Sequence, residues 1–202
     1  MTRDLPDHIA RRRAAAIAGH QGDAAAARAF LDDADPAVRA TALGALARSG
    51  DLRPADLGRG LDDDVATVRA RAAELAATRP GDGPPPLAPV LDDPDPVVVE
   101  AAAWSSGERD PAEPGIVDVL SRVGAGHDDP LCREAAVAAL GAIGDPAGLP
   151  AILAATRDRP AVRRRAVLAL APFDGREVDE AIERALGDRD WQVRQAAEDI
   201  AR

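Results

Sequence analysis

The sequence has no lysine, tyrosine or asparagine, and it contains a single cysteine, Cys132. All 25 basic residues are therefore arginines, a bias that we attribute to GC-rich codon usage and not to a physical requirement. A lone cysteine excludes an internal disulfide framework and fits a reducing compartment. No apolar run approaches the length of a membrane span, and no secretory h-region follows Met1. These absences predict a cytoplasmic protein.

The charge is strongly one-sided. The 202 residues include 35 acidic side chains, so the formal net charge is −10 and the pI is about 4.8. A molecule of this charge repels nucleic acid and anionic membranes. We therefore expect neither as a partner. An acidic surface can come from a salt-loving host or from a compositional bias of the lineage, and the composition fits both.

One phrase recurs along the chain at intervals of roughly 30 residues, which is the signature of a solenoid. It consists of an Asp-rich turn, usually a proline, and a helix that begins with a core residue followed by arginine. The core residue is valine in every copy but one, and its positions are Val38, Val68, Val98, Cys132, Val162 and Val193.

The clearest copy shows what each letter does. Asp35 suits the N-cap of a helix, and Pro36 suits its first position, because that backbone N–H has no helical partner. Val38, Ala42 and Leu46 then follow at helical spacing and form an apolar stripe. Each repeat therefore reads as two helices, with the second helix starting at the phrase.

These patterns predict an all-α fold, an α-solenoid of about five to six helical hairpins. We expect one domain over residues 1–202, in which a helix within 1–20 caps the first repeat. The Pro-rich stretches 79–86 and 110–114 are expected to be loops between repeats and not domain boundaries. The predicted repeats cover residues 23–50, 54–79, 84–108, 114–144, 146–172 and 175–202.

The segments Leu31 to Ala42 and Leu91 to Ala102 resemble the HEAT-repeat family, in particular the short HEAT-like repeats first associated with phycobilin lyase subunits. The resemblance implies a ladder in which a turn Asp meets an Arg six residues later. Three pairs match this spacing, namely Asp33 with Arg39, Asp63 with Arg69, and Asp188 with Arg194. The pattern departs at three positions, so we expect an interruption in mid-chain: Val99 replaces the Arg, while His127 and Arg157 replace the Asp.

The acidic turns have two explanations. Clustered carboxylates are ligands for hard cations, so a calcium site or a basic partner is conceivable. Helix capping and the ladder explain each aspartate locally, and no turn has the ligand spacing of an EF-hand loop. We favour capping.

The inner, concave face of the solenoid is the candidate binding surface. At about 100° per residue, positions 2, 6 and 9 after the core residue point away from the core. Most of these positions are small, which predicts an open groove. Trp104 is the exception, and the predicted site groups it with charged neighbours: Glu74, Glu100, Glu134 and Arg164.

An aromatic anchor among carboxylates suggests a seat for a basic peptide or protein segment. The alternative is that Trp104 leans sideways and fills the space left by Ser105, Ser106 and Gly107. The second tryptophan, Trp191, is expected to pack against Ile182 or Leu186 and close the last repeat.

No catalytic or metal-binding pattern is evident. Cys132 occupies a core position, and no histidine with an orienting partner suggests a triad. His8, His20 and His127 lie in different repeats without ligand spacing. Deoxyhypusine hydroxylase has related HEAT-like repeats and binds iron through His-Glu pairs, and this chain has no His-Glu dipeptide. We therefore predict no catalytic residues, metal or cofactor.

The function predicted from the sequence is a non-catalytic scaffold or adaptor that binds a protein or peptide partner on its concave face, and the carboxylates there would suit a basic partner. Consecutive arginines such as Arg163, Arg164 and Arg165 scatter around a helix, which argues against a nucleic-acid groove. The alternative comes from the family resemblance: an accessory subunit or lyase acting on a tetrapyrrole or another small molecule.

Overall fold

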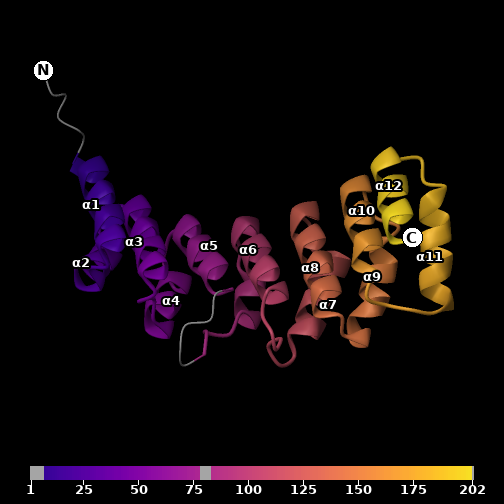
Figure 1. Ribbon diagram of the computed structural model, residues 1–202, viewed down its shortest axis with the longest axis horizontal. Helices are drawn as coiled ribbons and strands as arrows, with labels where there is room; N and C mark the ends of the chain where they lie inside the picture. Colours follow the sequence, from indigo (N-terminus) through magenta and orange to yellow (C-terminus); the bar gives the residue numbers. More distant parts are fainter. Residues whose placement is uncertain (1–6, 78–82, 202) are drawn as a thin grey trace, which may run out of the picture. The chain divides into compact units, whose positions relative to one another are not determined.

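A computed structural model describes residues 7–77 and 83–201, which contain twelve α-helices and no strand (Figure 1). The predicted all-α solenoid is confirmed. Across these residues no helix combines the length and apolarity needed to cross a membrane. The chain divides between Pro86 and Leu87 into two compact units, which are described separately. The single-domain organisation stays a prediction, and the predicted bounds at residues 1, 79 and 202 lie outside the described residues.

The first unit has two layers of helices. The second helices of the repeats, here called B helices, form one layer, in which α3 packs against both α1 and α5. The first helices, called A helices, form the other layer, with α2 against α3 and α4 against α5. The bounds are α1 (Asp7–Gln21), α2 (Ala24–Ala29), α3 (Pro36–Ser49), α4 (Pro54–Leu61) and α5 (Ala66–Leu75).

The second unit repeats this arrangement. Its B helices are α6 (Pro96–Gly107), α8 (Pro130–Ile143), α10 (Pro160–Ala169) and α12 (Trp191–Ile200). Each packs on the next, as Figure 1 shows for α6, α8 and α10. The A helices are α7 (Ile116–Gly126), α9 (Leu149–Ala155) and α11 (Arg176–Leu186). The first A element is only a 3₁₀ segment, Ala88–Asp92, because the prolines around it prevent a longer helix.

Aspartate caps account for the starts of most B helices. The Asp35 carboxylate accepts a hydrogen bond from the Ala37 N–H at 2.8 Å. The caps of α6, α8 and α12 repeat this contact at 3.0, 2.8 and 2.9 Å and are Asp95, Asp129 and Asp190. The capping interpretation of the acidic turns is confirmed at these residues. α5 and α10 differ, because their N-cap residues, Val65 and Arg159, provide no side-chain cap.

The core residue of each phrase is buried as predicted. Val38, Val98, Cys132 and Val162 are completely inaccessible, and the remaining two copies are 1 % exposed. The helical stripe that follows is buried as well, which places the core between the A and B layers. The repeated phrase therefore builds the fold, and its function is architectural.

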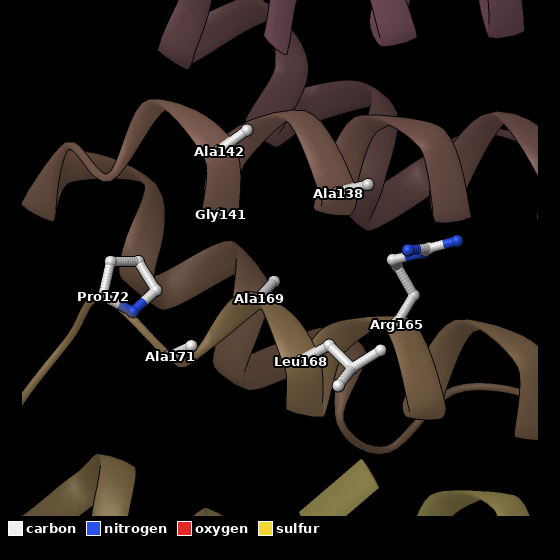
Figure 2. Close-up of a pocket in the computed structure, with 8 residues that line it drawn as sticks. All are labelled: Ala138, Gly141, Ala142, Arg165, Leu168, Ala169, Ala171 and Pro172. Atoms are coloured by element: carbon white, nitrogen blue, oxygen red, sulfur yellow. The ribbon is translucent and has the colours of Figure 1, made fainter. Parts of the chain in front are cut away.

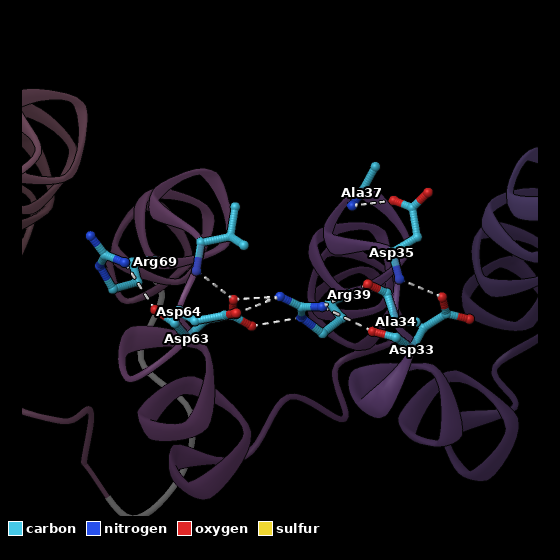
Figure 3. A network of polar contacts seen from close by, with 9 residues as sticks. Asp33, Ala34, Asp35, Ala37, Arg39, Asp63, Asp64 and Arg69 are labelled. Atoms are coloured by element: carbon cyan, nitrogen blue, oxygen red, sulfur yellow. Dashed lines mark hydrogen bonds and ion pairs between the residues drawn. The ribbon is translucent and has the colours of Figure 1, made fainter.

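The Asp–Arg ladder connects successive repeats, in a way that the spacing did not predict. Arg39 donates from Nε and Nη2 to the Asp63 carboxylate of the next repeat at 2.7 and 2.6 Å (Figure 3). Its Nη1 donates to the backbone carbonyl of Asp33 in its own turn at 2.9 Å. All three predicted Asp–Arg pairs meet, but through the backbone carbonyl of the Asp and not through its carboxylate. That Arg reaches the carbonyl, and the carboxylate belongs to the arginine one repeat earlier.

The second unit corrects a further expectation. Arg133 pairs with Asp158 at 2.7 Å and Arg163 pairs with Asp188 at 2.8 Å, so Arg157 does not interrupt the ladder. Asp158, one residue later in the turn, takes the place of the missing aspartate. A search at fixed spacing does not find this aspartate, because it lies one residue later, but the turn still places its carboxylate against Arg133.

One rung of the ladder, that is, one pair of an Arg and the carboxylate of the following turn, has lost both of its residues. Val99 stands at the arginine position and His127 at the aspartate position of the following turn. Because both members of the pair are replaced together, no unpaired guanidinium or carboxylate results at this rung. His127 Nδ1 still accepts the backbone N–H of Asp129 at 3.1 Å, the contact that Asp33 makes to Asp35 at 2.9 Å. The turn therefore keeps its internal hydrogen bond although the Asp–Arg pair is missing.

Small residues bring the B helices close together. A Cβ added to Gly141 would lie 2.7 Å from the Ala169 Cα, and one added to Gly107 would lie 2.8 Å from the Ala139 Cα. Gly19 meets Ala45 in the first unit in the same way. Close helix packing, which the prediction of an open groove did not consider, therefore explains these glycines.

The ladder makes a prediction for stability and its pH dependence. Arg163 lowers the pKa of Asp188 by hydrogen bonding to its carboxylate. Asp188→Asn keeps Oδ1 as an acceptor for the Asp190 N–H, but it removes the charge and replaces one of the two acceptors of Arg163 by an NH2 donor. We expect a loss of about 1–3 kcal/mol of unfolding free energy at pH 7, measured by urea denaturation. Since the folded pKa lies below the unfolded value of about 3.9, the loss should shrink as pH falls below 4.

The matched control is Glu180→Gln, which removes a carboxylate from an exposed pair with Arg176 on α11. That pair is worth about 0.5 kcal/mol or less. Equal losses in the two variants, or a difference that persists unchanged in acid, would contradict a stabilising role for the rung.

Helix contact makes a second prediction. Gly141→Ala should destabilise the protein by about 1–3 kcal/mol, because the new methyl meets backbone atoms of α10 that cannot rotate away. Gly126→Ala places its methyl in open space at the end of α7, and stability should be unchanged or slightly higher. Thermal unfolding of both variants measures the contrast, and equal melting temperatures would show that the contact at Gly141 adapts without strain.

Candidate protein-interaction surface

The second unit presents a continuous B-helix surface on the side opposite its A helices. We define the surface by the positions 2, 6 and 9 after each core residue. Because α6 packs on α8 and α8 packs on α10, equivalent positions lie in rows across the helices. The rows are Glu100, Glu134 and Arg164; Trp104, Ala138 and Leu168; and Gly107, Gly141 and Ala171.

Trp104 lies on this surface with 51 % of its area exposed. The neighbouring Ser105 and Ser106 are buried, and the Ser106 hydroxyl donates to the Ala102 carbonyl at 2.7 Å. About half of the indole is therefore accessible to a partner, whichever way its covered half leans. Glu100 precedes Trp104 by one helical turn, so the two side chains occupy the same face of α6.

Glu134 and Arg164 come together as an ion pair. The Glu134 Oε1 lies 3.8 Å from Arg164 Nη2 and 3.5 Å from Arg165 Nε, and the Glu134 side chain is only 17 % exposed. Two arginines therefore neutralise this carboxylate. Within the described part of the chain, Arg165 Nε has no hydrogen-bond acceptor, since its ion-pair distance is too long for one.

Glu74 belongs to the first unit, where it lies near the end of α5. Its Oε2 accepts from Arg71 Nη1 at 2.7 Å within the same helix. Among the predicted site residues, the structure thus joins Glu134 with Arg164 and places Trp104 and Glu100 on one helix face. The joint binding role of the whole set stays a prediction.

Two hollows indent the B-helix surface of the second unit. The first has a volume of 490 Å³ and lies between α8 and α10, with Arg165 at one end and Pro172 at the other (Figure 2). Its walls are mainly small and apolar. The lining residues are Ala138, Gly141, Ala142, Arg165, Leu168, Ala169, Ala171 and Pro172.

The second hollow, of 440 Å³, lies at the starts of α8, α10 and α12. It includes Glu134 and Arg164 from the predicted site. The other lining residues are Pro130, Leu131, Arg159, Pro160, Ala161 and Gln192.

Large apolar side chains are exposed beside this second hollow. Leu131 is 54 % exposed, and Trp191, which precedes the lining Gln192, is 65 % exposed. The predicted burial of Trp191 is wrong, because Val193, Ala185 and Ile182 close the last repeat without it. Sequence reasoning missed Leu131. The available signal was its position before the core residue, where the first repeat has only Ala37.

Residues with reactive side chains are dispersed or buried. Within residues 7–77 and 83–201, no three His, Cys, Asp or Glu side chains are grouped to hold a metal ion. Cys132 is fully buried, as predicted, and its Sγ contacts the Pro96 carbonyl oxygen at 3.2 Å. Burial, followed by the nearby Asp129 and Glu100, raises the pKa of this thiol to about 11.

Comparison with known families confirms the HEAT-like resemblance. Residues 84–161 match the model of HEAT repeats, a segment that contains the exposed Trp104 and all of α6 to α9. No match was found among curated proteins.

Solved structures with the same fold include natural and designed repeat proteins. An Escherichia coli protein, YibA, is similar with a TM-score of 0.63 and 18 % identity, covering 98 % of this chain and 75 % of YibA. Human deoxyhypusine hydroxylase in complex with glycerol gives 0.50 and 21 %, with coverage of 98 % and 80 %. A designed armadillo repeat protein in complex with the peptide (KR)4 gives 0.51 and 16 %, with coverage of 98 % and 94 %. At these identities the likeness shows the fold alone.

The environment of Cys132 makes a third prediction. At pH 7.5 the thiol is protonated and enclosed, so iodoacetamide should not alkylate it in the native protein. In urea the same thiol should react at the rate of an ordinary cysteine. Mass spectrometry of the two samples checks this, and rapid native alkylation would revive Cys132 as a nucleophile.

Proposed function

We propose that the protein is a non-catalytic scaffold that binds a segment of a partner protein on the B-helix surface. The observation that carries the proposal is the exposure of Trp104 beside Glu100 on α6. Exposed tryptophans at the centre of a surface are frequent anchors of protein interfaces. The proposed contacts on this surface are the predicted residues of the second unit, namely Trp104, Glu100, Glu134 and Arg164, while a role for Glu74 of the first unit stays a prediction.

A basic side chain is the partner group that suits Trp104. The face of an indole attracts a guanidinium or ammonium group, and a carboxylate one turn away adds a charged acceptor. Glu100 supplies that carboxylate. Because two arginines already neutralise Glu134, the basic residue would be recognised at Trp104 and Glu100 and not over α8.

The fold is consistent with this role. One protein with a similar fold, the designed armadillo repeat protein, was solved in complex with the peptide (KR)4. The transfer to this chain rests on its own exposed Trp104. The lone, buried Cys132 supports a reducing compartment, and we propose the cytoplasm.

The second candidate is the accessory subunit or lyase that would act on a tetrapyrrole or another small molecule. The hollow of 490 Å³ favours it, because ligand sites commonly have volumes of roughly 300–1,000 Å³. Its lining offers one arginine and no carboxylate, thiol, imidazole or hydroxyl side chain (Figure 2). These residues suit binding of an apolar group better than covalent chemistry.

The proposal is tested by titrating a capped octapeptide of alternating lysine and arginine into the protein. Trp104→Ala and Glu100→Gln should each weaken binding by about tenfold, since each removes a contact worth roughly 1–2 kcal/mol. The unfolding free energy of Trp104→Ala should stay within about 1 kcal/mol of the parent value, because half of the side chain is exposed. Calorimetry and urea denaturation measure the two quantities.

Trp191→Ala is the control, since it removes the other, more exposed tryptophan and leaves the net charge unchanged. It should bind the peptide as the parent does. If Trp104→Ala also binds normally, attraction to the net negative charge explains the binding, and the proposed site is wrong.

A further inference from the structure

The hollow at the starts of α8, α10 and α12 combines an apolar wall with basic groups. Leu131, Pro130, Pro160 and Ala161 provide the apolar part, and Leu131 exposes more than half of its surface there. Exposed apolar groups gathered around a hollow mark interaction sites on soluble proteins. Trp191 extends this character beyond Gln192.

The charge of the hollow is opposite to that of the protein. Among the side chains that line the hollow, Arg159 and Arg164 are positive and Glu134 is the one carboxylate. Just outside the lining, Arg165 also pairs with Glu134, and Asp158 adjoins Arg159. The protein as a whole carries −10. A locally positive hollow on an acidic molecule selects an anionic group by charge complementarity.

The two arginines are available for such a group. With respect to the described residues, the Arg159 guanidinium forms no hydrogen bond or ion pair; the bonded groups are in its backbone, where the N–H donates to Asp158 and the carbonyl accepts from the Arg163 N–H. Arg164 is held at 3.8 Å from Glu134, too far for a hydrogen bond. Its side chain is 38 % exposed. The ladder does not use either residue.

We infer that this hollow docks a segment of the partner protein in which an acidic residue adjoins an apolar one. The carboxylate would lie between Arg159 and Arg164, and the apolar side chain would pack on Leu131. The inference rests on the proposed function, and it adds a polarity to the partner: basic where it meets Trp104 on α6, and acidic where it reaches α10 and α12. A basic segment is disfavoured at the hollow because it would meet two arginines.

The two tryptophans provide a separate reporter for each contact region. Trp104→Phe leaves Trp191 as the only tryptophan, beside the hollow, and Trp191→Phe leaves Trp104. Each full-length variant is titrated with three capped peptides of equal length, Gly/Ser-flanked, with a central Leu-Glu-Leu-Glu, Leu-Gln-Leu-Gln or Leu-Lys-Leu-Lys. Fluorescence emission reports binding.

The Glu peptide should change the emission of Trp191, with an affinity at least about tenfold above those of the Gln and Lys peptides. Arg159→Ala with Arg164→Ala, built into the Trp104→Phe variant, should reduce that affinity at least about tenfold. Arg176→Ala with Arg189→Ala is the matched control, with the same change of net charge at exposed positions, and should bind as the parent does.

Three results would overturn the inference: no response of Trp191 to the Glu peptide, an equal response to the Lys peptide, or unchanged affinity in the Arg159 and Arg164 variant. The proposed function fails separately, if the basic octapeptide binds without regard to Trp104. A Trp191 response with no role for Trp104 would retain the hollow as an independent docking site.

Discussion

Within each unit, the structure depends on the guanidinium that joins a turn to the next one wherever the Asp–Arg pair is present. Its Nη1 binds a carbonyl of its own turn, while Nε and Nη2 bind the following carboxylate, as Arg39 does with Asp33 and Asp63 (Figure 3). The planar arginine fork meets two fixed acceptors at once, which sets both the direction and the spacing of neighbouring repeats. A lysine would provide the charge without this geometry. The rung is therefore a positioning device as much as an attraction.

The parts of this arrangement that are local could be predicted from the sequence. Asp35 caps and Pro36 begins α3 because both act within one helical turn, and the buried stripe follows from helical periodicity. The rung between Arg133 and Asp158 could not be predicted, because it joins residues in different repeats and tolerates a shift of one residue in the turn. Fixed spacing detects the repeated letters but not the atoms that they bring together.

The surface was harder to predict than the core, for a related reason. Trp104 was placed on the binding face, but whether an aromatic leans inward or outward depends on the volume of its neighbours, here two buried serines that need little space. Gly107 and Gly141 look like parts of an open groove in a sequence. Only the packed helices show that a methyl group there would meet the next backbone. A small residue on a B helix can thus allow close contact with the next helix and at the same time leave the outer surface open.

The arginine run on α10 shows how one helix serves both purposes. Successive residues are about 100° apart, so neighbours in sequence face different surroundings. Arg163 is buried in the ladder with Asp188, whereas Arg164 reaches the hollow at the start of α10 and Arg165 closes the groove along it. Only Arg163 takes part in the ladder, so the positive charges that a partner can reach on α10 are those of Arg164 and Arg165. The angle of about 100° between successive residues thus decides which arginine supports the fold and which arginines face a partner.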